Sequence, residues 1–138
     1  MSSPELDKVE LPALDQLQAL GWQYLEGAKL SPEESDERDS YKEVVLEKRL
    51  SLSIKRINPW ISDENLHKVV RDLTRATYTN LIEANQQIWE TLNKCVSVMQ
   101  DLGKGNKGQT VRIIDFDNPD NNEFLCVNQF KVSGPEQN

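Results

Sequence analysis

Residues 103–110, GKGNKGQT, are the stretch of this sequence that comes closest to a nucleotide-binding motif. The phosphate-binding loop has the pattern GxxxxGK[ST], in which the lysine contacts the phosphates of the nucleotide. Gln109 stands where that lysine is required. The next residues, VRII at 111–114, are typical of a strand, whereas the motif needs a helix whose first turn faces the phosphate. We therefore predict a turn between two strands.

A cluster of acidic side chains offers a second candidate chemistry. Its members are Asp115, Asp117, Asp120 and Glu123. Hard cations such as Ca²⁺ and Mg²⁺ take oxygen ligands of this kind. The spacing does not match an EF-hand loop, because Pro119 occupies the fifth position, where the third ligand is needed. We predict an Asx-type turn between strands, with a cation site as the alternative.

The remaining chemistry-bearing residues are few. His67 is the single histidine and is predicted to lie on the polar side of a helix with Asp63 and Arg71. Cys95 and Cys126 are too few for a four-cysteine zinc site, and one histidine excludes a Cys2His2 set, so both are expected to be reduced core thiols. The GxSxG nucleophile motif is absent. Classical covalent catalysis is not expected.

The charge is negative overall but unevenly placed. The net charge of −7 opposes strong nonspecific DNA binding through bulk charge. Residues 31–43 are acidic, whereas residues 42–56 hold five bases and two acids. The basic side chains that we consider for contact with DNA or a partner are Lys48, Arg49, Lys55 and Arg56. The alternative is that these charges only keep the surface solvated.

Apolar residues at helical spacing predict four helices. The first covers residues 10–20 and ends at Gly21, in a cap that brings Trp22 onto Leu17. The second covers residues 41–57, and the third and fourth follow caps at Ser62 and Asn80.

The second helix is expected to begin at a Ser40 cap and to be covered on two faces. Its two apolar stripes are Leu46, Leu50, Ile54 and Ile57 on one side and Tyr41, Val44, Val45 and Leu52 on the other. Glu43 falls within the first stripe, so we expect its carboxylate to meet a basic group, a metal ion or water at the edge of the core, with an ion pair favoured.

Period-two patterns predict strands at residues 95–99, 111–114 and 124–132, and a short extended segment lies between Trp22 and Gly27. The first two strands are expected to form a hairpin. Residues 1–9 are expected to be flexible, 29–40 to form an acidic loop and 133–138 a tail. The fold class is therefore α+β in one domain of 138 residues, with N-terminal helices packed on a small mixed or antiparallel sheet. No transmembrane or signal segment is recognisable, which favours a soluble cytoplasmic protein.

Three blocks of sequence carry a resemblance to a known family. They are LQALGWQY at residues 17–24, SYKEVVLEKRL at residues 40–50 and IDFDNPDNNEFLCVNQF at residues 114–130. Together they closely resemble the N-terminal region of the R subunits of type I restriction enzymes, over residues 8–132.

The resemblance implies a Mg²⁺-dependent nuclease domain of the PD-(D/E)xK type, followed in the parent subunit by ATP-driven translocase domains. It also implies DNA as substrate and methyltransferase and specificity subunits as partners. In the family the catalytic aspartate and the ExK pair lie on strands after the one that matches residues 124–132. We therefore expect no catalytic residue and no bound Mg²⁺ or ATP in this chain, which should not cut DNA alone.

Related nucleases place a glutamate on the first helix near the metal, and Glu10 matches that position. The alternative for Glu10 is an acid that suits the first turn of a helix. A different class of function also stays open: a stand-alone α+β module that binds a protein or nucleic acid through the basic helix.

Overall fold

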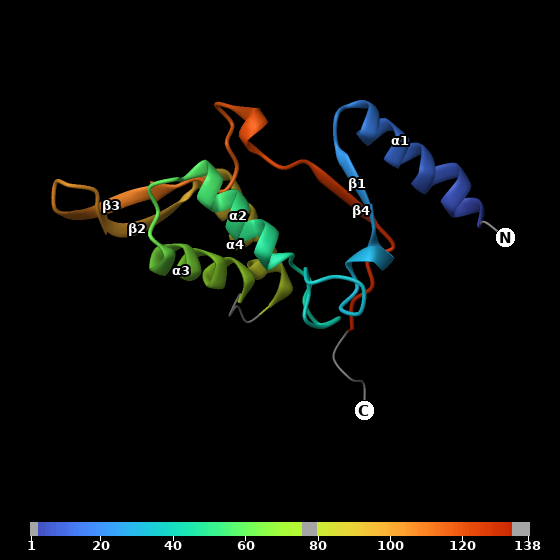
Figure 1. The fold of residues 1–138 in the computed structure, drawn as a ribbon, viewed down its shortest axis with the longest axis horizontal. Helices are drawn as coiled ribbons and strands as arrows, with labels where there is room; N and C mark the ends of the chain where they lie inside the picture. The colour runs from blue at the N-terminus through green and yellow to red at the C-terminus, as the bar shows by residue number, and fades with distance from the viewer. Residues whose placement is uncertain (1–2, 76–79, 134–138) are drawn as a thin grey trace. The chain divides into compact units, whose positions relative to one another are not determined.

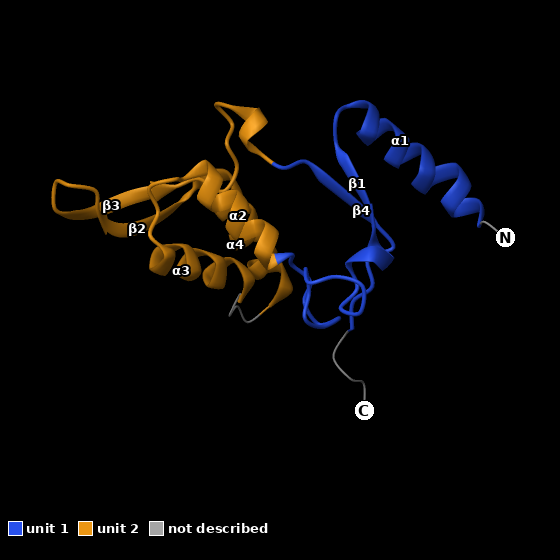
Figure 2. Ribbon diagram, viewed as in Figure 1, with its two compact units in different colours: residues 1–46, 123–138 blue, residues 47–122 orange. Residues whose placement is uncertain are grey.

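The computed structural model describes residues 3–75 and 80–133 (Figure 1). The described residues form four α-helices and two two-stranded sheets, which confirms the α+β class. The chain divides into two compact units, residues 1–46 with 123–138 and residues 47–122 (Figure 2). Each unit contains one of the sheets, where a single small sheet was expected. The assignment to one domain stays a prediction, and residues 134–138 of the expected tail lie outside the described residues.

The first unit begins with helical turns. The helix α1 (Leu11–Ala19) follows the π-helix η1 (Leu6–Glu10), so part of the segment that we expected to be flexible is helical. Gly21 ends α1 with a φ of 97°. The Trp22 N–H donates to the Leu17 carbonyl at 3.0 Å and the Gly21 N–H to the Gln18 carbonyl at 3.0 Å. These two bonds are the Schellman cap that the sequence predicts.

The sheet of the first unit joins segments that are far apart in the sequence. β1 (Gln23–Glu26) and β4 (Leu125–Asn128) lie side by side as parallel strands (Figure 1). The strand expected over residues 124–132 is therefore shorter than predicted. It ends where Gln129 takes a φ of 50°, which turns the backbone out of the extended conformation.

The second predicted helix is wrong over its first six residues. After η2 (Gly27–Leu30) the chain stays irregular, and α2 starts only at Glu47 (Glu47–Ile57). Arg38 Nη2 donates to the carbonyl oxygens of Tyr41 at 3.1 Å and Glu43 at 2.6 Å. In a helix these carbonyls would accept N–H groups four residues further on. Because Arg38 occupies both, the helix starts later.

Two further expectations for this region are corrected. The Ser40 hydroxyl accepts the N–H of Lys42 at 3.2 Å in a local turn, so it caps no helix. Val44 and Leu52 of the second apolar stripe are 66% and 69% exposed. Helix α2 is therefore covered on one side, the side that carries the fully buried Ile54.

The second unit holds the larger core. It contains α2, α3 (Asp63–Thr74), α4 (Leu81–Lys94) and the hairpin of β2 (Val96–Asp101) and β3 (Asn106–Val111). The buried cluster consists of Ile54, Ile61, Leu66, Val69, Val70, Val98, Val111 and Ile113. The predicted caps are confirmed, since Ser62 Oγ accepts from Asn65 N at 3.1 Å and Asn80 Oδ1 from Glu83 N at 2.8 Å.

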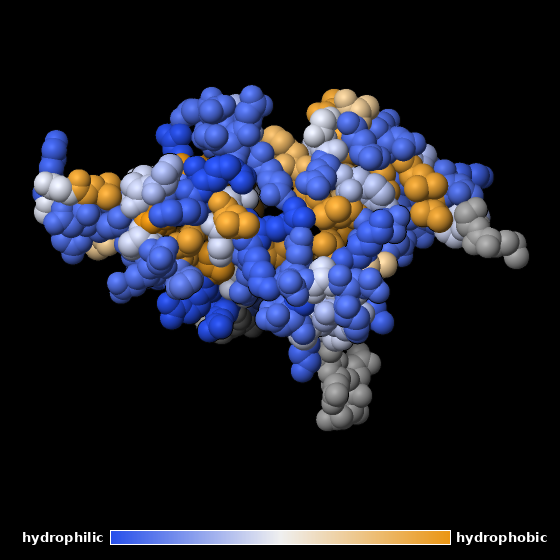
Figure 3. Space-filling model, viewed as in Figure 1, coloured by the Kyte–Doolittle hydropathy of each residue, from blue (hydrophilic) through white to orange (hydrophobic). Residues whose placement is uncertain are grey.

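Many apolar side chains reach the surface (Figure 3). Helix α4 contains no buried residue, and Leu81, Ile82 and Trp89 are 75%, 80% and 63% exposed. Between residues 3 and 133, leaving aside 76–79, no helix is both long and apolar enough to cross a membrane.

Candidate functional site

Residues 103–105 of the glycine-rich stretch form the predicted hairpin turn, whereas residues 106–110 belong to β3. The strand predicted over residues 111–114 therefore begins five residues earlier and ends at Val111. Asp101 Oδ1 accepts the backbone N–H groups of Gly103 at 2.7 Å and Gly105 at 3.1 Å, and both glycines have positive φ. The chain then continues as β3, without the helix that would face a phosphate group. This loop therefore has the geometry of a strand connection.

The acidic cluster forms the predicted Asx-type turn around Asp115. Asp115 Oδ1 accepts the N–H groups of Asp117 at 3.1 Å and Asn118 at 2.9 Å, and Oδ2 accepts from Asn121 Nδ2 at 3.0 Å. The Asn121 hydrogen bond, followed by the backbone bonds, holds the pKa of Asp115 below its usual range. Asp117 pairs with Arg112. These contacts use carboxylate oxygens that a cation would need.

Glu10, the candidate metal ligand, lies at the start of α1 and reaches toward the end of β4. Its Oε1 accepts from Gln129 Nε2 at 2.8 Å. Its Oε2 is buried and has no hydrogen-bond partner among the described residues. The neighbouring Tyr24 hydroxyl donates to Asn128 Oδ1 at 2.9 Å. Burial first, and then the charges of Glu26 and Glu10, raise the pKa of Tyr24.

Mg²⁺ requires several oxygen ligands in near-octahedral geometry. Within residues 3–75 and 80–133, no group of three or more histidine, cysteine, aspartate or glutamate side chains is placed to hold a metal ion. Glu10 offers one unpartnered carboxylate oxygen. The described residues therefore do not make a complete Mg²⁺ centre by themselves, and the role of Glu10 as a metal ligand stays a prediction.

Glu43 differs from its expected environment because it lies before α2. Its Oε2 accepts a hydrogen bond from the Asp39 N–H at 2.5 Å. The partner of this carboxylate oxygen is therefore a backbone N–H group, whereas we expected a basic side chain.

The four predicted basic contacts separate into two groups. Lys55 Nζ donates to the Ile61 carbonyl at 2.6 Å, and Arg56 Nε donates to the Asn121 carbonyl at 2.8 Å. These two side chains stabilise their own unit. Lys48 is exposed and Arg49 half-buried near the start of α2. The role of all four in DNA binding stays a prediction.

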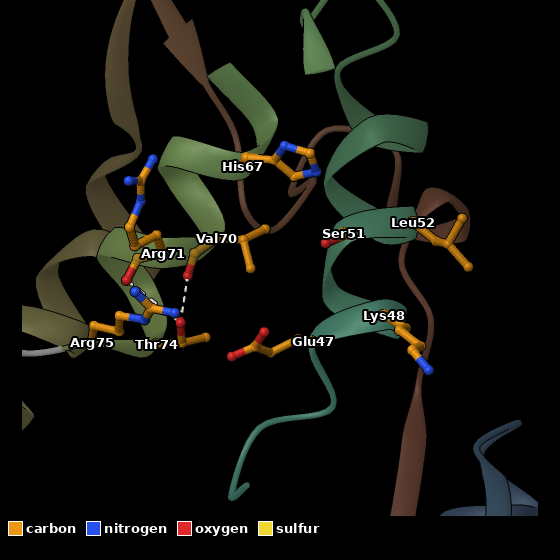
Figure 4. A pocket seen from close by; sticks show the side chains of 9 residues that line it. All are labelled: Glu47, Lys48, Ser51, Leu52, His67, Val70, Arg71, Thr74 and Arg75. Atoms are coloured by element: carbon orange, nitrogen blue, oxygen red, sulfur yellow. Dashed lines mark hydrogen bonds between the residues drawn. The ribbon is translucent and has the colours of Figure 1, made fainter. Parts of the chain in front are cut away.

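Lys48 lines a groove of about 670 Å³ between α2 and α3 (Figure 4). The groove is lined by Glu47, Lys48, Ser51, Leu52, His67, Val70, Arg71, Thr74 and Arg75. His67 is exposed, as predicted, and points from α3 toward α2. Arg71 and Arg75 lie outside the basic stretch of residues 42–56 that the sequence indicated. The sequence pattern that could have indicated them is the spacing of four residues, typical of one helix face, from His67 to Arg71 and from Arg71 to Arg75.

Arg38 is a buried arginine that the sequence did not indicate. Arg38 is 2% exposed, although it belongs to the predicted acidic loop. Besides the two carbonyls before α2, it donates from Nη1 to the Lys131 carbonyl at 2.7 Å. Its guanidinium carbon lies 4.2 Å from the centre of the Phe130 ring and 5.6 Å from that of Tyr41. No local sequence pattern marks this base for burial.

Comparison with known sequences places this α+β chain in a family. The sequence model of the type I restriction enzyme R protein N terminus matches residues 3–138. The chain belongs to this family.

Two relatives have names that agree with it. A putative type I restriction enzyme MjaIXP endonuclease subunit from Methanocaldococcus jannaschii is 36% identical over 124 residues, which are 90% of this chain and 12% of that protein. The type I restriction enzyme HindI endonuclease subunit from Haemophilus influenzae is 30% identical over 125 residues, again 90% of this chain and 12% of that protein. The chain thus spans about an eighth of the length of these relatives.

A GTPase Obg from Mycoplasmopsis agalactiae is 30% identical over 128 residues, 87% of this chain and 28% of that protein. The glycine-rich turn of this chain lacks the lysine of a phosphate loop. No match was found among solved structures.

Proposed function

We infer that these residues form the front part of a PD-(D/E)xK nuclease domain in the R subunit of a type I restriction enzyme. The complete subunit would cleave and translocate DNA with Mg²⁺ and ATP, together with methyltransferase and specificity subunits in the cytoplasm. Membership of the R protein N-terminal family and the names of two relatives support this proposal. The role of this chain is a scaffold, with the catalytic aspartate and the ExK pair supplied by later strands.

The observation that carries the proposal is the arrangement of Glu10. A buried carboxylate oxygen without a partner is costly, so it is suited to a ligand that arrives with the rest of a site. Gln129 holds the other oxygen and so orients the carboxylate beside the end of β4. Later strands that extend the sheet from β4 would bring further oxygen ligands to this place. When bound, Mg²⁺ would stabilise the developing negative charge during hydrolysis of the phosphodiester.

The first experiment uses the 138-residue chain with Mg²⁺ and plasmid DNA. We expect no cleavage, because the described residues supply one ligand and no complete centre. Robust cleavage that survives Glu10→Ala would overturn the proposal.

The second experiment uses the complete R subunit assembled with its partner subunits. Glu10→Gln should lower DNA cleavage by tenfold or more, on the order of the loss of one charged ligand interaction. Glu5→Gln is the matched control, because Glu5 is exposed and lies in the helical turns before α1. Equal activity of the two variants would exclude Glu10 as a metal ligand.

The competing function is a stand-alone α+β module that binds a protein or nucleic acid. It is favoured by the second unit, which contains its own core and a basic groove. A reading frame that continues past residue 138 into strands with an aspartate and an ExK pair supports the nuclease domain, whereas a stop codon there supports the module.

A further inference from the structure

We propose that the groove between α2 and α3 binds the phosphate backbone of duplex DNA through Arg71 and Arg75, with Lys48 at its other wall. This inference rests on the proposed function, from which it takes DNA as the substrate. It moves the contact surface from the predicted stretch on α2 to the junction of two helices.

The contacts of the predicted bases are the first reason for this change. Lys55 and Arg56 donate to the carbonyl oxygens of Ile61 and Asn121. A phosphate group would have to compete with these bonds. Lys48 is the member of the predicted set that lines the groove, and it is exposed on the α2 side.

The spacing of the α3 bases is the second reason. His67, Arg71 and Arg75 follow one another at intervals of four residues, so they form a row along one side of the helix end with steps of about 6 Å. Figure 4 shows His67 directed toward α2, and Glu47 and Ser51 directed toward α3. Lys48 and Arg71 extend outward from the two helices, so they flank the groove on its two sides. The two arginines of this row, with Lys48 on α2, suit a polyanion with repeated charges better than they suit one isolated anion.

The local charge is the third reason. The lining residues include three permanent bases, Lys48, Arg71 and Arg75, and one acid, Glu47. The lining residues therefore carry a net positive charge, whereas the whole chain has a net charge of −7. The planar guanidinium of arginine can donate two parallel hydrogen bonds to a phosphate group, which makes the two arginines the stronger contacts.

A free nucleotide is a poorer occupant of this groove. Nucleotide sites usually surround the phosphates with backbone N–H groups from a glycine-rich loop. The lining residues of the groove include no glycine. The glycine-rich loop of this chain is the turn of the β2–β3 hairpin.

The position of the bases also allows a purely structural role. Arg71 is in the last turn of α3 and Arg75 is its C-cap residue, where positive charge stabilises the helix dipole. The test must therefore separate binding from stability.

The experiment measures the affinity of the 138-residue chain for a fluorescein-labelled duplex by anisotropy between 50 and 200 mM salt, an interval over which phosphate contacts weaken by roughly tenfold or more. Arg71→Gln/Arg75→Gln should lower the affinity by about tenfold or more and reduce the slope of log K against log salt by about 2. Lys104→Gln/Lys107→Gln removes the same charge from the hairpin and should lower the affinity by about twofold or less.

The proposal is overturned if wild type does not bind the duplex at 50 mM salt, a condition that favours roughly micromolar nonspecific contacts, or if the two double variants lose the same affinity. Competition with ATP tests for a nucleotide site. If ATP displaces the duplex at equal salt, and if ATP binds the arginine variant more weakly than wild type, the groove is a nucleotide site and the proposal is overturned.

A second readout does not depend on the folding of the variants. Phenylglyoxal modifies accessible arginines, and the duplex should protect Arg71 and Arg75 in wild-type protein. Unprotected arginines in a saturated complex would exclude the groove. That result would leave the scaffold proposal intact, because the scaffold is tested by Glu10 and by plasmid cleavage.

Discussion

Arg38 shows how one residue determines the local path of a chain. Its guanidinium group donates to the carbonyls of Tyr41, Glu43 and Lys131 and lies over the ring of Phe130. These contacts join the acidic loop to the segment after β4 within the first unit. A buried charge is tolerated here because carbonyl oxygens and aromatic faces replace most of its hydration.

We predict that Arg38→Lys lowers the free energy of unfolding by about 2 to 3 kcal/mol. Lysine keeps the charge but cannot reach three carbonyls with a planar group. Urea unfolding followed by circular dichroism gives the difference. Lys29→Gln, at an exposed position, should change stability by about 0.5 kcal/mol or less. Equal stability of the lysine variant and wild type would show that the carbonyl contacts are dispensable.

Asp115 makes stability depend on pH in the acidic range. Its pKa is lowered in the folded protein, so its ionised form contributes stability above the ordinary aspartate pKa of about 4, and this contribution is lost as the pH falls through the lowered pKa. Asp115→Asn should therefore be less stable than wild type at neutral pH. The difference should shrink in urea titrations below about pH 4. The exposed Asp120→Asn serves as control, and a pH-independent difference would contradict the assignment.

At the scale of elements, two glycines illustrate different constraints. Gly21 ends α1 with a φ of 97°, and a Cβ added there meets nothing within 4 Å. Gly27 follows β1, and a Cβ there would lie 2.4 Å from the carbonyl oxygens of both Asn128 and Gln129. The first glycine is required by backbone conformation and the second by the close approach of two strands.

We predict that Gly21→Ala costs about 1 kcal/mol, since only the left-handed backbone conformation is penalised. Gly27→Ala should cost about 3 kcal/mol or more, because the β1–β4 pair has to move apart. Unfolding in urea measures both variants against wild type. Similar costs would mean that the strands separate easily at this end.

At the scale of the whole molecule, the buried apolar cluster belongs entirely to the second unit. Residues 47–122 are also continuous in sequence. The first unit joins two distant segments through β1 and β4 and has fewer buried side chains, Leu14 and Leu30 among them. The two units therefore differ in how their stability arises.

We predict that residues 47–122 expressed alone unfold in one cooperative urea transition. Ile54→Ala should lower the stability of this piece by about 2 to 5 kcal/mol, because Ile54 is fully buried. Trp89→Ala should cost much less, because that side chain is 63% exposed. A gradual transition without a baseline would show that the cluster needs the rest of the chain.

Much of the fold could be predicted from local pattern. The caps at Ser62 and Asn80, the Schellman cap at Gly21 and the turn around Asp115 each depend on residues within a few positions of one another. Such contacts are encoded locally, so the sequence shows them directly. The α+β class followed from the change of hydrophobic period after the fourth helix.

The sites were harder to predict because they depend on partners far away in the sequence. Glu10 meets Gln129, Arg38 meets Lys131, and Lys48 shares a groove with Arg75. Helical periodicity predicted a helix that begins at Tyr41. Periodicity contains no information about Arg38, whose guanidinium donates to the carbonyls of Tyr41 and Glu43.

By itself, the sequence determined the α+β class, the caps of the helices, the presence of a hairpin and which family the chain resembles. Only the tertiary structure decided that β1 pairs with β4, that Arg38 is buried and that Lys55 and Arg56 serve their own unit. The physical reason is that propensity and capping act over a few residues, whereas burial and hydrogen-bond competition depend on what the folded chain brings together.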